Sequence, residues 1–215
     1  MSRLQLLERD ARAASSSSPP TPLVALDPNP PSWLASWCRG ARRALETGFP
    51  AGGLSPTSGG LFRAVNQLAG RTVWVARGER HDQPSRVVAA IRDLPQDAAV
   101  LAEAAAVCAQ LTATLIVTHA VPKSFPQRSL GLDEAVDRGR LRLATAARTA
   151  AAWLPPGSPV VSRLARVRPH ELVGEELDAD LLVIGGPRGE AADGLGLVVS
   201  NALRHAPCPV LLAAR

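Results

Sequence analysis

Glycines gather in one C-terminal segment whose chemistry is that of an anion-binding loop. Gly185, Gly186 and Gly189 follow or end the apolar run in ADLLVIGGPRG, and Gly196 stands before a stretch with helical patterning. Glycines let backbone amides approach phosphate oxygens, and the first turn of a helix supplies positive potential. The segment is therefore a candidate phosphate cradle, provided that a strand precedes it and a helix follows it.

The sequence lacks the motifs of nucleophilic and phosphoryl-transfer enzymes that we sought. GGPRG has no Lys-Ser or Lys-Thr of a P-loop, and no GxSxG occurs anywhere in the chain. Ser200 falls inside an expected helix and has no acid-base pair of its own. We therefore predict no catalytic residue.

Histidine and cysteine give only weak candidates for a metal site. His205 and Cys208 form an HxxC pair, but a histidine suits the end of a helix and the cysteine enters an expected buried strand. With Cys38 and Cys108 the cysteines number three, without a CxxC, so we expect reduced thiols and no metal. His119 ends an expected strand and faces the crevice region, where we expect it to serve local packing.

Apolar runs alternate with helical patterns from residue 86 onward, in a regular βαβ order. Asp97 is a plausible N-cap, and Pro169 fits the first turn of a short helix. The alternation predicts a parallel sheet with helices on both faces and a crevice at the carboxyl ends of its strands. The expected strands are 86–91, 112–121, 159–167, 180–185 and 209–214, and the expected helices are 96–111, 132–154, 169–177 and 195–206.

Residues 1–85 have a different character. AASSSSPPTP and LDPNPPS are linker-like, so we expect a divergent, partly disordered extension. Helices are expected over 32–46 and 61–70, and 71–78 repeats the helix-to-strand order seen at the C-terminus. An offset of 138 residues places 60–77 on 198–215, with Ala64 on Ala202 and Val65 on Leu203. A decayed first copy of a tandem pair and an unrelated extension are both open.

The segment 86–215 resembles the universal stress protein family. The resemblance is carried by ALRHAPCPVLL (202–212), by DADLLVIGG (178–186) and by the strand-helix-strand opening. It implies a Rossmann-like five-stranded parallel sheet of the adenine nucleotide alpha hydrolase-like kind, frequent dimerisation and, in many members, ATP binding. The cofactor-binding positions that it implies are Asp93, Val121, Gly185, Gly186, Gly189, Gly196 and Val198.

This chain departs from the ATP-binding members of that family in two places. Their acidic residue at the tip of the first strand falls on Arg92, with Asp93 displaced by one, and an arginine cannot accept a hydrogen bond. Their G-x2-G-x9-G-[ST] loop is shortened to six residues between Gly189 and Gly196, and Leu197 takes the hydroxyl position. Counting the nine residues from Gly189 without a gap keeps Ser200 at the hydroxyl position but places Val199 at the third glycine. We therefore expect a degenerate site with weak ATP binding at most.

These observations lead us to expect a non-enzymatic stress-response or regulatory protein. The alternatives are a genuine ATP binder with slow or no hydrolysis, and a dimerisation scaffold with an empty crevice. No apolar run approaches the ~18 residues of a membrane span and the first residues are charged, so we expect a cytoplasmic protein.

Two partner predictions follow from local patterns. The apolar strand from Pro209 to Ala214 needs a partner at its edge, which is either the same strand of a second copy in a homodimer or TVWVA (72–76) of the same chain. CRGARR (38–43) beside Trp33 and Trp37 is expected to be a solvated helix face with inward tryptophans. We therefore expect no nucleic-acid partner, although the net charge is +5.

Overall fold

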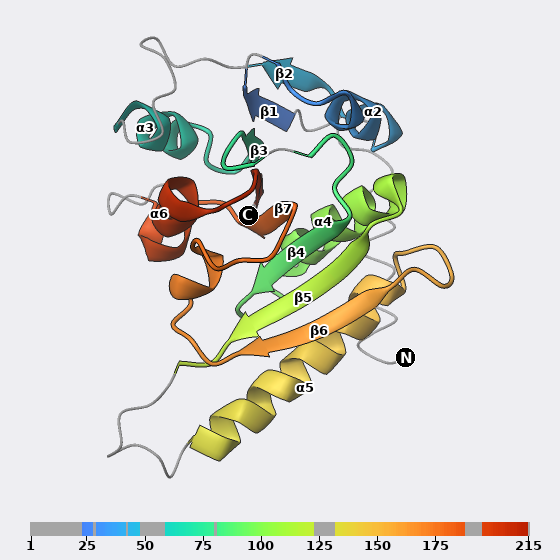
Figure 1. The fold of residues 1–215 in the computed structure, drawn as a ribbon, viewed down its shortest axis with the longest axis vertical. Helices are drawn as coiled ribbons and strands as arrows, with labels where there is room; N and C mark the ends of the chain where they lie inside the picture. The colour runs from blue at the N-terminus through green and yellow to red at the C-terminus, as the bar shows by residue number, and fades with distance from the viewer. Residues whose placement is uncertain are drawn as a thin grey trace.

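The computed structural model describes residues 23–27, 29–41, 43–47, 59–79, 81–122, 132–187 and 195–214. They form one eight-stranded sheet in the order β2-β1-β3-β8-β7-β4-β5-β6, with helices on both faces (Figure 1). The strands are β1 (Leu23–Leu26), β2 (Leu45–Thr47), β3 (Thr72–Val75), β4 (Arg86–Ile91), β5 (Thr114–Ala120), β6 (Val160–Ala165), β7 (Leu181–Gly185) and β8 (Val210–Ala213). The helices are α2 (Ser32–Gly40), α3 (Gly59–Gln67), α4 (Ala98–Leu111), α5 (Leu132–Ala151), η2 (Glu171–Val173) and α6 (Gly196–His205).

The strands after residue 85 form the expected five-stranded parallel unit. Its order is β8-β7-β4-β5-β6, and all four neighbouring pairs are parallel. The βαβ pattern predicted these elements to within about three residues at each end, apart from one helix. The short helix expected over 169–177 is only the 3-10 turn η2, because Gly174 follows at once.

The described N-terminal residues extend this sheet by three strands. β1 pairs in parallel with β2 and β3, and β3 pairs antiparallel with β8. The helix expected over 32–46 was wrong at its end, since α2 stops at Gly40 and residues 45–47 form β2. β1 was not predicted, because its four apolar residues lie between two proline-rich stretches.

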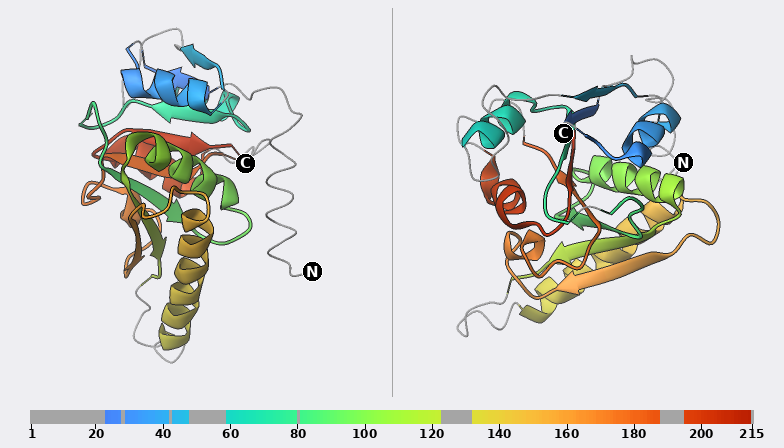
Figure 2. Two further views of the ribbon diagram at one scale, coloured as in Figure 1. Left: turned by 90° about the vertical axis from the view of Figure 1, so that its right-hand side faces the viewer. Right: turned by 45° about the horizontal axis from the view of Figure 1, so that its top comes forward.

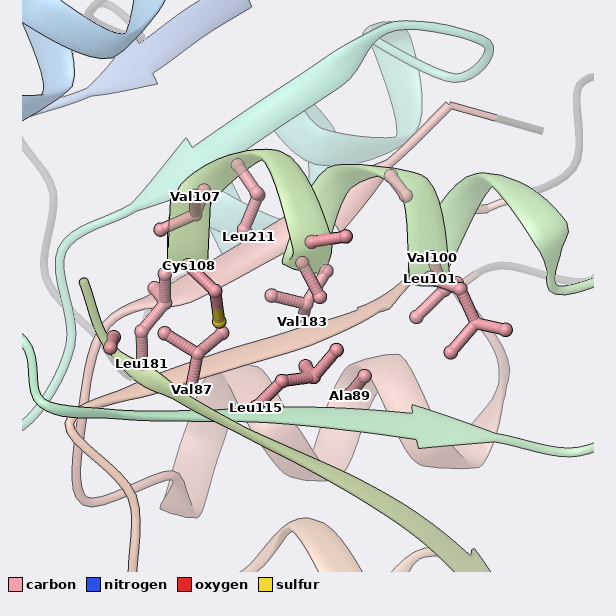
Figure 3. Packing of buried hydrophobic residues seen from close by; sticks show 14 of the residues in the cluster. Val87, Ala89, Val100, Leu101, Val107, Cys108, Leu115, Leu181, Val183 and Leu211 are labelled. Atoms are coloured by element: carbon pink, nitrogen blue, oxygen red, sulfur yellow. The ribbon is translucent and has the colours of Figure 1, made fainter. Parts of the chain in front are cut away.

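Helices cover each face of the sheet and enclose a separate core (Figure 2). On one face, α2, α4 and α5 pack on the strands, and Trp33 and Trp37 point inward as expected. Figure 3 shows the centre of this core, where Val100, Leu101 and Cys108 of α4 lie over strand residues such as Val183 and Leu211. On the other face, α3 and α6 cover the alternate strand residues.

The β3–β8 pair occupies the edge that a homodimer through the C-terminal strand would need. Val73, Trp74 and Val75 face Leu212, Leu211 and Val210, so β8 has β7 on one side and β3 on the other. This is the internal cover that the sequence allowed as the alternative. Pairing of the strand Pro209 to Ala214 with a second copy would therefore have to displace β3, and the homodimer stays a prediction.

The same pair follows a local two-fold relation. An offset of 138 residues places β3 on β8 from end to end, and places α3 on residues 197–205 of α6. Val73 pairs with Leu212, which is the residue 138 positions after Trp74. Trp74 pairs with Leu211, which is the residue 138 positions after Val73. Such reciprocal pairing is the pattern of a symmetric interface between two copies.

Two further contacts join the N-terminal half to the rest of the sheet. Arg43 makes a paired ion contact with the buried carboxylate of Glu103 on α4, and the Thr72 hydroxyl donates to the same carboxylate at 3.2 Å. Gly78 has a φ of +50°, and a Cβ there would lie 1.8 Å from the carbonyl oxygen of Pro207. Only glycine fits this approach.

Among the described residues, no helix combines the length and the apolar character that a membrane crossing requires.

Candidate functional site

A hollow of about 370 Å³ lies at the carboxyl ends of β4, β5 and β7, beside the start of α6. This is the crevice that the sheet order predicts, because parallel strands place their carboxyl ends at one edge. Its walls are mainly apolar. The residues that line it are Ala90, Ile91, Arg92, His119, Ala120, Pro169, Leu172, Ile184, Gly185, Gly186, Pro187, Leu195, Gly196, Leu197, Val198 and Val199.

Arg92 supplies the cationic side chain of this lining, which contains no carboxylate. Its backbone is held by Asp97, whose Oδ2 accepts from the amides of Arg92 at 2.5 Å and of Asp93 at 2.9 Å. Asp97 also directly precedes α4, as its expected N-cap position requires. The loop after β4 is therefore fixed so that the arginine, rather than an acid, stands at the hollow.

Asp93 was expected to bind a ligand, but the structure places it away from the lining. Its Oδ1 lies 3.3 Å from Nε of Arg142 on α5, and the same oxygen accepts from the amide of Leu94 at 2.9 Å. The one-residue displacement from the strand end turns this carboxylate toward α5. The Asp93 carboxylate therefore already forms an ion pair within the protein.

Two glycines expected in the cradle serve the sheet as well as the hollow. The amide of Gly186 donates to the carbonyl of Ala213 at 2.8 Å, and Gly185 pairs with Ala213 in the β7–β8 ladder. A Cβ on Gly186 would lie 3.0 Å from the Ala213 carbonyl oxygen. The close approach of β7 and β8 thus favours glycine here, and its amide is not available to an anion.

The other positions implied by the resemblance divide between lining and core. Gly196 lines the hollow with a φ of +70°, which favours glycine, and Val198 lines it as well. Val121 is buried outside the lining, and its amide donates to the carbonyl of Ala165 at 2.9 Å. Its side chain packs closely against Gly139 of α5. Gly189 lies outside the described residues.

Leu197 stands where the family pattern has a hydroxyl. Its side chain is 75% exposed although it is a large apolar group, and it lines the hollow at the first turn of α6. At this position the hollow therefore meets an apolar side chain, and the loss of the hydroxyl stays a prediction. Ser200, the hydroxyl of the gapless count, lies one turn further along α6 and does not line this hollow.

His119 is the titratable base of the lining. Its Nδ1 lies 3.0 Å from the carbonyl oxygen of Ile91, so Nδ1 carries the proton in this contact. The ring is buried and also packs close to Gly139. Both expectations for His119 hold, because it lines the hollow and its local hydrogen bond fixes the ring.

The described residues contain no group of three or more His, Cys, Asp or Glu side chains suited to a metal ion. Burial raises the pKa of the Cys108 and Cys208 thiols to about 12, which keeps both neutral. His205 lies 3.4 Å from Glu175 rather than beside Cys208 in a ligand set. The HxxC pair is thus divided between the surface and the core.

Residues 169–172 form a wall of the hollow that the motif analysis did not single out. Pro169 and Leu172 line it from the loop after β6, and the carbonyl of His170 accepts from the side-chain amide of Asn201 on α6. The order of elements predicted only that some loop would lie at this end of the sheet. Contact with α6 determines which residues of the loop reach the hollow.

Comparisons with solved structures return proteins of one fold. A universal stress protein solved in complex with cAMP is 24% identical, with a TM-score of 0.51 over 61% of this chain and 97% of that chain. One from Archaeoglobus fulgidus is 20% identical over 85% of this chain and 75% of that one, with a TM-score of 0.53. A protein from Pseudomonas aeruginosa described as a putative universal stress protein is 18% identical over 99% and 88%, with a TM-score of 0.53.

A search of curated proteins found no match. The family model described as the universal stress protein family matches residues 84–214, which is more than half of the chain and includes every strand from β4 to β8. The chain therefore belongs to the universal stress protein family.

Proposed function

We propose that this protein is a non-enzymatic regulatory protein of the stress response that binds a small anionic ligand in the crevice. The observation that carries the proposal is the lining itself, in which apolar walls surround one guanidinium, that of Arg92, and no carboxylate. A volume of about 370 Å³ lies within the range of small-molecule sites. Mostly apolar walls with few polar groups are also typical of such sites.

Nucleotides are the class of ligand that best fits this crevice. It opens at the strand ends beside the start of a ten-residue helix, where an anion is stabilised. The ligand of the similar protein that was solved with cAMP has a single phosphate group, and that protein's chain is matched over 97% of its length. We therefore propose a nucleoside monophosphate or a ligand of comparable size and charge.

ATP itself should bind weakly for reasons visible in the site. Asp93 is engaged by Arg142, and Leu197 offers no hydroxyl to a phosphate. Two missing polar contacts cost about 2 to 4 kcal/mol together, which weakens binding by roughly thirty- to a thousandfold. A site of this design would bind ATP in the high micromolar to millimolar range.

Catalysis is not part of the proposal. The lining offers one histidine, His119, and it has no hydroxyl, thiol or carboxylate partner within that lining. Its Nδ1 already faces the Ile91 carbonyl oxygen.

The three described cysteines are buried and unpaired, which suits a reducing compartment such as the cytoplasm.

Calorimetric titration of the full chain tests this proposal. The dissociation constant of ATP with Mg²⁺ should lie well above about 10 μM. AMP and cAMP should bind at least as tightly as ATP. Leu197→Ser should tighten ATP binding about fivefold by restoring one hydrogen bond. Leu141→Ser is the matched control, because Leu141 is 67% exposed on α5, away from the lining, and should change nothing.

Two results would replace the proposal by another function. An ATP dissociation constant of about 10 μM or less, lost in Gly196→Val, would identify a genuine ATP-binding member. Absence of binding by every nucleotide tested would favour a scaffold with an empty crevice.

A further inference from the structure

A second hollow, of about 540 Å³, lies between α3 of the N-terminal half and α6. The two helices lie side by side in Figures 1 and 2. Three residues of α3 and five residues around α6 line it, namely Phe62, Arg63, Asn66, Leu195, Gly196, Leu197, Ser200 and Arg204. The hollow therefore exists only where the two halves of the chain meet.

The lining follows one face of each helix. Gly196, Ser200 and Arg204 recur every four residues along α6, so the hollow extends over about 12 Å at the rise of an α-helix. The offset of 138 that relates β3 to β8 also relates Phe62 to Ser200 and Asn66 to Arg204. Equivalent positions therefore line the groove from both helices, but their side chains differ.

The electrostatics of the hollow are cationic. Arg63 and Arg204 line it together with an amide and a hydroxyl, and no carboxylate belongs to the lining. Neither arginine takes part in any of the ion pairs between described residues. Both side chains are exposed, so their guanidinium groups are accessible.

Two contacts hold Arg204 in place at the far end of the hollow. Its guanidinium carbon lies 4.8 Å from the centre of the Phe62 ring, and its main-chain carbonyl accepts from Nη2 of Arg77. Arg77 thus brings a third positive charge to this end of α6, and its Nε has no hydrogen-bond partner among the described residues. A stacked arginine loses less conformational freedom when it binds an anion.

We propose that this hollow is a second binding site, for phosphoryl groups held by Arg63 and Arg204. Guanidinium groups bind phosphate oxygens through paired hydrogen bonds, and Asn66 and Ser200 add neutral donors between them. The elongated shape suits a chain of phosphoryl groups rather than a single ion. We take a free polyphosphate as the ligand. Binding of the phosphate tail of a nucleotide is the alternative that the test separates, because Leu195, Gly196 and Leu197 line both hollows.

The site goes beyond the proposed function, since it needs no ligand in the crevice. The test is calorimetric titration of the full chain with tripolyphosphate, AMP and ATP at low ionic strength. Arg63→Gln combined with Arg204→Gln should weaken tripolyphosphate binding at least tenfold. Arg148→Gln on α5 is the matched control: it removes one exposed helical charge outside the lining and should change the affinity less than twofold. Thermal unfolding establishes that the variants remain folded.

The pattern of results separates this site from the crevice. Tripolyphosphate binding that depends on the two arginines, together with unchanged AMP binding, supports the site for free polyphosphate. Loss of ATP affinity with unchanged AMP affinity, in the double variant, identifies the tail of a nucleotide as the ligand. If tripolyphosphate does not bind, or if Arg148→Gln weakens it equally, the second site is refuted, whatever AMP does. If tripolyphosphate binds and no nucleotide does, the second site stands and the proposed function fails.

Discussion

The ion pair between Arg43 and Glu103 should be the main electrostatic link between the N-terminal half and the parallel unit of β4 to β8 that follows it. Arg43 comes after α2, and Glu103 lies on α4 with its side chain only 8% exposed. Arg43→Ala leaves this carboxylate buried with a single described hydrogen bond, from the Thr72 hydroxyl at 3.2 Å. We expect the substitution to weaken the contact between the halves.

The magnitude follows from burial. Removing one partner of a buried ion pair costs about 3 to 5 kcal/mol, and Arg43 is itself 22% exposed, which places the effect near the lower end. The guanidinium carbon also lies 5.3 Å from the centre of the Trp37 ring, a contact worth about 0.5 to 1 kcal/mol. We therefore expect Arg43→Ala to lower the free energy of unfolding by about 3 kcal/mol.

Urea unfolding followed by tryptophan fluorescence measures this directly, because Trp33, Trp37 and Trp74 are buried in the N-terminal half. Replacing both Arg43 and Glu103 by Met should cost about 1 kcal/mol or less, since no buried charge remains unpaired. Arg71→Ala is the control, because its pair with Glu46 is exposed and worth less than about 1 kcal/mol. A loss below about 1 kcal/mol for Arg43→Ala, or an equal loss in the double variant, would refute the reasoning.

Two further predictions concern acid stability and assembly. Burial opposes ionisation of Asp180, but hydrogen bonds from Ser85 and Arg86 outweigh it and lower its pKa from 3.8 to about 2. The carboxylate should therefore contribute about 1 to 2 kcal/mol at neutral pH, allowing for solvent screening, and this stability should be lost as the pH falls from about 4 to 2. Unfolding curves of Asp180→Asn should lack this acid-dependent loss, and an unchanged pH profile would contradict the assignment. Deleting residues 1–84 removes β3 and uncovers β8, so light scattering should show dimers that the full chain does not form through this edge. A deleted chain that stays monomeric would show that this edge needs no cover.

The order of elements after residue 85 could be predicted because it depends on local patterns. Apolar runs of four to seven residues, such as those of β4 and β7, alternate with helical patterns, and each pattern specifies its own element. The helix α5 also carries acids in its first turn and an arginine in its last. The position of the crevice followed from the same order, since parallel strands align their carboxyl ends. The cover on β8 was predicted only as one of two options, because a strand sequence does not specify which edge it meets.

The direction of side chains at the site required the tertiary structure. The sequence placed Arg92 and Asp93 at the end of the first strand. Only the packing of α5 shows that Arg142 forms an ion pair with the Asp93 carboxylate. Likewise, Gly186 reads as part of a phosphate loop, whereas its amide belongs to the contact with Ala213. Contacts between residues distant in the chain decide both cases.

By itself, the sequence determined the family and the parallel unit, because each depends on patterns among residues that are neighbours in the chain. The tertiary structure decided that the N-terminal residues complete the sheet and that α3 and α6 enclose a cationic hollow. Those features arise from pairings across about 138 positions, where the free energy comes from burial and hydrogen bonding between segments whose local patterns do not specify which partner each one meets.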